Sequence, residues 1–132
     1  MKYLLDTDVC IYLINKRPSS VLEKLHACRA GDVGVSAVTV AELRYGASKS
    51  QRSRQNHEAL DLFLAPLEMM AFDESAAIAY GEIRAQLEKA GDPIGPLDML
   101  IAGQAKSLNV VLVTNNVREF KKVKGLKIEA WS

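Results

Sequence analysis

Acidic side chains at separated places in the sequence are the residues best suited to chemistry. Asp6 and Asp8 follow a short apolar run at the start of the chain. Glu42 lies in a segment with helical spacing whose flanking helical positions are largely apolar, and Asp98 takes the third position of a predicted helix. A carboxylate among apolar neighbours is costly unless a cation or hydrogen bonds satisfy it. These acids are therefore candidates for a common site.

Each acid also has an ordinary structural explanation. Asp6 or Asp8 can cap the helix that follows, and taken alone this is the favoured interpretation. Glu42 can form a salt bridge with a neighbouring arginine, which fits its position about as well as a functional role does. The helix dipole favours a negative charge at the position of Asp98. Only the combination of the acids points to a site.

The predicted strands and helices explain how distant acids could meet. Strands alternating with helices predict an α/β fold whose parallel sheet is covered on both faces. Residues 2–5 would form a strand buried on both faces, and acids that follow such a strand lie where ligands bind in open α/β sheets. The expected strands are 2–5, 33–35, 67–72, 110–113 and 126–128, and the expected helices are 9–15, 18–25, 38–46, 55–64, 76–90 and 96–108.

Hard oxygen donors without nitrogen or sulfur suit Mg²⁺, or Mn²⁺, better than zinc. The chain has two histidines, His26 and His57, and neither forms a motif with these acids. Carboxylates gathered at one sheet edge repel one another unless a cation compensates them. The acidic cluster therefore predicts a divalent metal.

Bulk properties predict one soluble domain, residues 1–132, with a proper hydrophobic core. Hydrophobic residues make up 48% of the chain, charged residues 25%, and the net charge of +1 favours no partner by itself. Cys10 and Cys28 lack paired or ligand-like spacing, which predicts buried free thiols in a reducing cytosol. No apolar run is long enough to span a membrane.

Four motifs in order resemble the VapC toxins, which are PIN-domain ribonucleases of bacterial toxin–antitoxin pairs. The resemblance runs nearly end to end. The motifs are residues 5–8 (LDTD), 36–47 (SAVTVAELRYGA), 94–98 (IGPLD) and 113–120 (VTNNVREF), and the closing 129–132 (EAWS) matches too.

The resemblance implies a three-layer α/β/α PIN-like fold with a central, mainly parallel sheet of four to five strands. It implies a Mg²⁺-dependent endoribonuclease in which Asp6 and Asp98 bind the metal and Glu42 completes the acidic cluster. The subgroup it resembles most cuts initiator tRNA in the anticodon loop, which would arrest translation. A VapB-type antitoxin would be the partner, with a homodimer and, with antitoxin, a larger hetero-oligomer as assemblies.

Two departures from the family pattern leave roles open. The family usually has Asn where this chain has Asp8, so Asp8 either strengthens metal binding or caps the helix. Many relatives carry an acid where this chain has Asn116. Either Glu119 supplies the fourth carboxylate, or Asn116 holds a metal-bound water. Thr7 and Thr114 are expected to donate hydroxyl hydrogen bonds to carboxylates or to phosphate.

Basic residues offer a surface for the RNA backbone, since such contacts give affinity without sequence choice. The ordinary alternative is a solvated surface. The residues are Arg44, Lys49, Arg52 and Arg54 in an acid-free stretch, and Arg118, Lys121, Lys122 and Lys124 in the tail.

Two other functions fit parts of the sequence. Residues 6–9 (DTDV) also match the opening of haloacid-dehalogenase-type phosphatases, in which the first Asp is a nucleophile. Against this, the chain is short, and Asp92 and Asp98 follow a helix where that family has acids after a strand. A PIN domain that binds RNA or antitoxin without cutting is the second alternative, which Asn116 leaves open.

Overall fold

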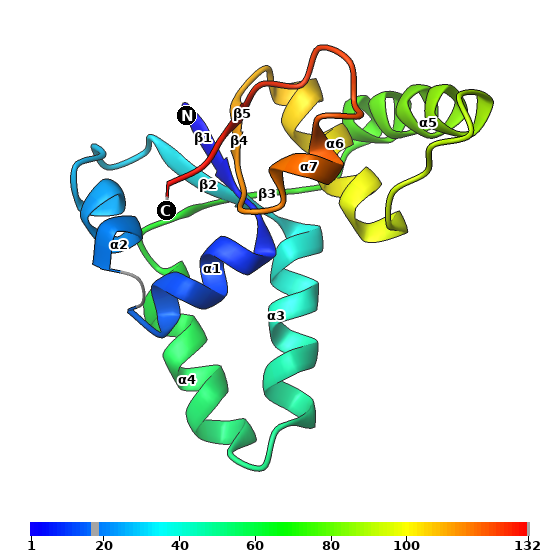
Figure 1. Ribbon diagram of the computed structural model, residues 1–132. Helices are drawn as coiled ribbons and strands as arrows, with labels where there is room; N and C mark the ends of the chain where they lie inside the picture. Colours follow the sequence, from blue (N-terminus) through cyan, green and yellow to red (C-terminus); the bar gives the residue numbers. More distant parts are fainter. Residues whose placement is uncertain (17–18, 132) are drawn as a thin grey trace.

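The computed structural model describes residues 1–16 and 19–131, which form one parallel five-stranded sheet with helices on both faces (Figure 1). The strand order is β3-β2-β1-β4-β5. β1 (Tyr3–Leu5) lies at the centre between β2 (Val33–Ser36) and β4 (Val111–Val113), and β3 (Glu68–Met70) and β5 (Ile128–Glu129) form the edges. The three-layer α/β/α prediction is confirmed.

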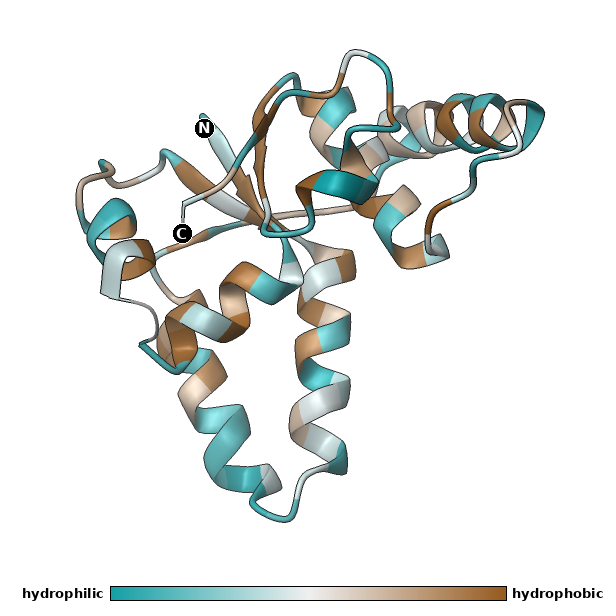
Figure 2. Ribbon diagram, viewed as in Figure 1, coloured by the Kyte–Doolittle hydropathy of each residue, from teal (hydrophilic) through white to brown (hydrophobic). Residues whose placement is uncertain are grey.

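The central strand is buried on both faces because successive side chains of a strand point to opposite sides. Leu4 joins the core beneath α5 and α6, and Leu5 joins the core beneath α1 to α4. Both side chains are fully buried. Figure 2 shows hydrophobic residues concentrated in the strands, whereas the loop between α3 and α4 is hydrophilic. The helices are α1 (Thr7–Ile14), α2 (Ser19–His26), α3 (Ala37–Lys49), α4 (Ser53–Leu64), α5 (Glu74–Lys89), α6 (Pro96–Leu108) and α7 (Val117–Phe120).

Local sequence signals account for most helix ends. Ser36 caps α3 by accepting a hydrogen bond from the Val38 N–H (3.1 Å), and Asp73 caps α5 in the same way from Ala76 (3.0 Å). α5 ends at Lys89, and Gly91 follows two residues later with a φ of 69°, which suits glycine. Among the described helices, none combines the length and hydrophobicity that a membrane-spanning segment needs.

Several boundaries differ from the sequence-based expectation; among them, α4 begins at Ser53 rather than at residue 55, and β5 is Ile128–Glu129 rather than 126–128. α1 begins at Thr7 rather than at residue 9, because Asp6 is its N-cap. α3 continues to Lys49, three residues past the predicted end at Gly46. The third strand is shorter than the predicted 67–72, and it lies at the sheet edge, where Glu68 and Met69 are exposed and Met70 packs against the core. The predicted start of the second helix at Pro18 lies outside the described residues. So does Ser132, the last residue of the closing motif 129–132.

Candidate active site

Asp6 is held rigidly at the carboxyl edge of the sheet. The side chain is 5% exposed. Its Oδ1 accepts a hydrogen bond from the Thr7 N–H (2.8 Å), and its Oδ2 accepts one from the Thr114 hydroxyl (2.7 Å). Thr114, which directly follows β4, is fully buried and accepts in turn from the Asn116 N–H (2.9 Å). The ends of neighbouring strands β1 and β4 thus fix one carboxylate.

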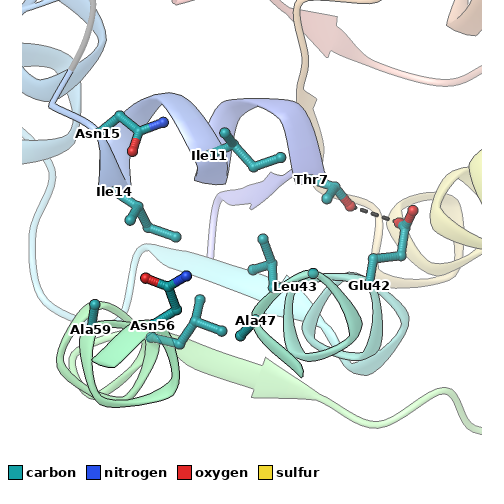
Figure 3. A pocket seen from close by; sticks show the side chains of 11 residues that line it. Thr7, Ile11, Ile14, Asn15, Glu42, Leu43, Ala47, Asn56 and Ala59 are labelled. Carbon is teal, nitrogen blue, oxygen red and sulfur yellow. Dashed lines mark hydrogen bonds between the residues drawn. The ribbon is translucent and has the colours of Figure 1, made fainter. Parts of the chain in front are cut away.

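Glu42 is brought to the same edge by α3. The Thr7 hydroxyl donates to Glu42 Oε1 (2.7 Å), which is the dashed line in Figure 3. The Thr7 hydroxyl also lies 3.3 Å from that of Thr39, which is fully buried one turn earlier on α3. Sequence analysis missed Thr39, although its spacing of three residues from Glu42 places both on one helix face. The alternative role of Glu42, a salt bridge with a neighbouring arginine, is not seen for Arg44. Arg44 pairs with Asp61 instead (2.6 Å).

Asp98 is half-buried at the third position of α6, where the negative charges of the other acids act on it. Burial first, and then the negative charges of Asp6, Glu42 and Glu119, together raise the pKa of Asp98 to about 6. The fold therefore brings together all four acids predicted for the site. They come from four elements that are far apart in the sequence.

Asp8 lies in the first turn of α1 beside Asp6, and it is Asp6 that caps this helix. Burial, and then the charge of Asp6, raises the pKa of Asp8 to about 6. Its Oδ1 is buried and has no hydrogen-bond partner within residues 1–16 and 19–131. Asp8 thus adds a further acidic oxygen next to the cluster.

Asn116 is the N-cap of α7, and Glu119 lies in its first turn. The Glu119 carboxylate pairs with Lys122 (3.4 Å), which also pairs with Asp92 (3.0 Å). Asn116 is exposed at the N-cap position of α7 and makes no side-chain cap hydrogen bond. Which of the two completes the site stays a prediction, although Glu119 is the one whose charge reaches Asp98.

The carboxylate oxygens of these acids are the type of ligand that a divalent cation prefers. The acids offer oxygen ligands only, and the raised pKa values of Asp8 and Asp98 mean that their ionised forms lack compensating charge. In the part of the chain that the structure describes, no three His, Cys, Asp or Glu side chains converge as ready ligands of one ion. The fit therefore rests on donor type and on uncompensated charge.

A pocket of about 260 Å³ opens from this acidic cluster between α1, α3 and α4 (Figure 3). Thr7 and Glu42 line its end at the cluster, and apolar side chains such as Ile11 and Leu43 line its walls. Asn56 lies among them, pointing from α4 toward α1. Glu42 thus lies at one end of a largely apolar groove.

Comparisons with known proteins agree with this arrangement. The PIN domain family matches residues 3–126. The chain is 42% identical to the tRNA(fMet)-specific endonuclease VapC of Shigella flexneri, over 100% of this chain and 99% of that protein. It is 43% identical to Ribonuclease VapC2 of Rickettsia felis, over 99% and 98% of the two chains.

Solved structures give the same result. DNA-bound VapBC from Salmonella typhimurium superposes with a TM-score of 0.95 at 40% identity, covering 100% of this chain and 99% of that chain. VapBC2 from Rickettsia felis, bound to a DNA fragment from its promoter, superposes with a TM-score of 0.93 at 42% identity over the whole of both chains. The fold and site define a PIN domain. The chain belongs to the PIN-domain family, and within it to the VapC-type toxins.

This membership corrects one alternative. Residues 6–9 resemble the first motif of the phosphatases, but the chain does not belong to that family, because the PIN family matches residues 3–126.

Proposed function

We propose that this protein is a metal-dependent endoribonuclease, a single-domain toxin of a type II toxin–antitoxin pair that acts in the cytoplasm. The observation that carries the proposal is the acidic cluster, in which three neighbouring carboxylates and burial raise the pKa of Asp98 to about 6. A group of acids held together against their mutual repulsion stabilises the fold poorly but suits a divalent cation. The named activity of the similar VapC proteins supports the same reaction.

Asp6 and Asp98 would hold Mg²⁺, or Mn²⁺, and Glu42 would complete the cluster. When bound, such a cation activates water at neutral pH and offsets charge on the scissile phosphate. The Thr114 hydroxyl keeps one Asp6 oxygen in place, and the Thr7 hydroxyl does the same for Glu42. Because these donors are fixed before substrate arrives, the carboxylates need little reorganisation during the reaction.

Positive charge at the far end of the α3–α4 pair offers contacts for the RNA backbone. We call the exposed side chains of Lys49, Arg52 and Arg54 the basic arm. Arg44 does not belong to it, because its half-buried guanidinium donates to Asp61 and His57. Arg54 pairs with Glu58 (3.4 Å) but its side chain stays 93% exposed. Lys122 is likewise occupied by Asp92 and Glu119. The arm would contribute affinity that falls with salt concentration.

The substrate we propose is initiator tRNA, cut in the anticodon loop, and the partner is a VapB-type antitoxin. The name of the Shigella flexneri relative supports the substrate, and the VapBC complexes support the partner. A homodimer of the toxin would be the unit that the antitoxin binds. A PIN module that binds RNA without cutting is disfavoured, because Asp6, Glu42 and Asp98 are all present and close together.

The test is incubation of antitoxin-free protein with total RNA in Mg²⁺, Mn²⁺ or chelator, beside Asp6→Asn. Discrete fragments that need metal and disappear in the variant are expected, and mapped ends in the initiator tRNA anticodon loop would support the substrate. Asp73→Asn is the matched control, because this acid caps α5 outside the cluster. Fragments that persist in chelator, or with Asp6→Asn, would contradict the proposal.

A further inference from the structure

A polar side chain lies in the middle of the buried helix α6. Gln104 is 1% exposed, and its neighbours on α6 are buried apolar residues, among them Ile101, Ala102 and Ala105. Its two amide atoms are both used. The Ser36 hydroxyl donates to Gln104 Oε1 (2.9 Å), and Gln104 Nε2 donates to the Ala71 carbonyl (3.3 Å).

These hydrogen bonds form a chain with one direction. The Val38 N–H donates to Ser36 Oγ, so the Ser36 hydroxyl hydrogen is free to donate to Gln104 Oε1. Gln104 Nε2 then donates to the Ala71 carbonyl that follows β3. A reversed amide would set its oxygen against that carbonyl oxygen, which cannot donate. The chain therefore fixes one orientation of the Gln104 side chain.

The connection joins the two helices that carry the acids. Ser36 ends β2 and caps α3, and Glu42 follows it by six residues. Asp98 precedes Gln104 by six residues on α6, roughly 9 Å along the helix axis. A slide or rotation of α6 relative to the start of α3 would therefore change the distance between Asp98 and Glu42.

The neighbouring residue on α6 is fixed by close packing. Gly103 lies so near the backbone of α5 that a Cβ there would be 2.9 Å from the Tyr80 nitrogen. Packing thus sets the distance from α6 to α5, and the hydrogen bond from Ser36 to Gln104 adds a directional contact between α6 and the start of α3. Packing alone is less directional than hydrogen bonds, and satisfied polar groups in a core select one arrangement more than they add stability.

We propose that Gln104, hydrogen-bonded to Ser36, is a positioning residue that holds α6 against the start of α3 and so sets the separation of Asp98 and Glu42 for metal binding. This inference rests on the proposed function of the acidic cluster. Gln104 touches neither acid, so its effect passes through the two helices. An apolar side chain could fill the space of Gln104, as apolar residues do at the neighbouring positions of α6, but it could not form these hydrogen bonds.

Gln104→Met is the first variant, because it removes both hydrogen bonds and keeps a similar length. The measurements are Mn²⁺ affinity by calorimetry without substrate, kcat and KM for RNA cleavage, and unfolding without metal. We expect Mn²⁺ affinity and kcat to fall about tenfold each, with KM for RNA little changed. Ile83→Val is the matched control, since Ile83 lies in the same core and carries no polar group.

Ser36 supplies a second route that does not depend on Gln104→Met folding. Ser36→Thr keeps the hydroxyl and should retain Mn²⁺ affinity, whereas Ser36→Ala should lose it to the same degree as Gln104→Met. Because Ser36→Ala also removes a helix cap, Asp73→Ala is its control for a lost cap on α5.

The outcomes separate this inference from the proposed function. Gln104→Met with wild-type Mn²⁺ affinity and kcat, or with losses no larger than those of Ile83→Val at equal loss of stability, would overturn the positioning role alone. Equal Mn²⁺ affinity of Ser36→Ala and Ser36→Thr would do the same. A wild-type protein that neither binds Mn²⁺ nor cleaves RNA would overturn the proposed function, and this inference with it.

Discussion

Replacing Asp98 by Asn should stabilise the metal-free protein while destroying its response to metal. The Asp98 carboxyl has its pKa raised from 3.8 to about 6 by burial first and by Asp6, Glu42 and Glu119 next. A carboxyl whose folded-state pKa is raised contributes stability that is complete below its unfolded pKa. That contribution is lost as the pH rises through about 6. At pH 7.5 the ionised side chain therefore opposes folding, and Asn removes the charge.

The size of the effect follows from the shift. A rise of about two pKa units corresponds to a ceiling of about 3 kcal/mol at 1.36 kcal/mol per unit. Solvent screens the half-exposed side chain, and Asn also loses a favourable interaction with the start of α6, so about 1 kcal/mol is expected. For a chain of this size that is a rise in Tm of about 3–5 °C.

The assay is thermal unfolding of wild type and Asp98→Asn with chelator and with Mn²⁺. In chelator at pH 7.5 the variant should be the more stable protein, and the difference should shrink toward zero near pH 4. In saturating Mn²⁺ the order should reverse, because a ligand at 100 times its Kd adds about 2.7 kcal/mol to wild type alone. A variant that is less stable in chelator, or a difference that does not change with pH, would refute the reasoning.

Three further predictions concern Thr114, the basic arm and the thiols. Thr114→Val should leave Asp6 Oδ2 without its donor, lower the free energy of unfolding by about 1–3 kcal/mol and abolish cleavage. Thr114→Ser keeps the hydroxyl and should retain both the stability and the cleavage. Equal activity of the two variants would contradict this prediction. Replacing the three cations of the basic arm by Gln should weaken RNA binding and reduce the slope of log K against log[salt] by about 2–3, and an unchanged slope in a binding titration would remove the arm from the interface. Burial raises the pKa of the Cys10 thiol, so iodoacetamide at pH 8 should label Cys28 first; early labelling of Cys10 in native protein would count against the buried site.

The sequence was sufficient to predict the sheet and the acids but not the side chains that hold them. Alternating strands and helices predict that Asp6, directly after the first strand, lies at the carboxyl edge of a parallel sheet. Glu42 and Asp98 are expected near the same edge from their positions in helices rather than after strands. Asp6 and Asp8 are equally able to cap α1. The extended backbone at Asp6 (φ −72°, ψ 159°) decides between them, and sequence does not show it.

Thr39 and Gln104 show why the rest escaped prediction. Both are single polar residues inside helices, where a pattern of hydrophobic spacing marks them only as interruptions. Their partners, Thr7 and Ser36, lie 32 and 68 residues away in the sequence. Only the packing of α3 and α6 on the sheet brings these pairs together, so their importance depends on tertiary structure.

The most direct test of the central claim is anomalous diffraction from crystals of the antitoxin-free protein soaked in Mn²⁺. The account predicts manganese within coordination distance of carboxylate oxygens of Asp6 and Asp98, with Glu42 next to it. Loss of that peak in Asp98→Asn crystals should accompany loss of RNA cleavage. Protein that cleaves RNA while its manganese lies elsewhere, with Asp6 and Asp98 contacting only protein, would contradict the account.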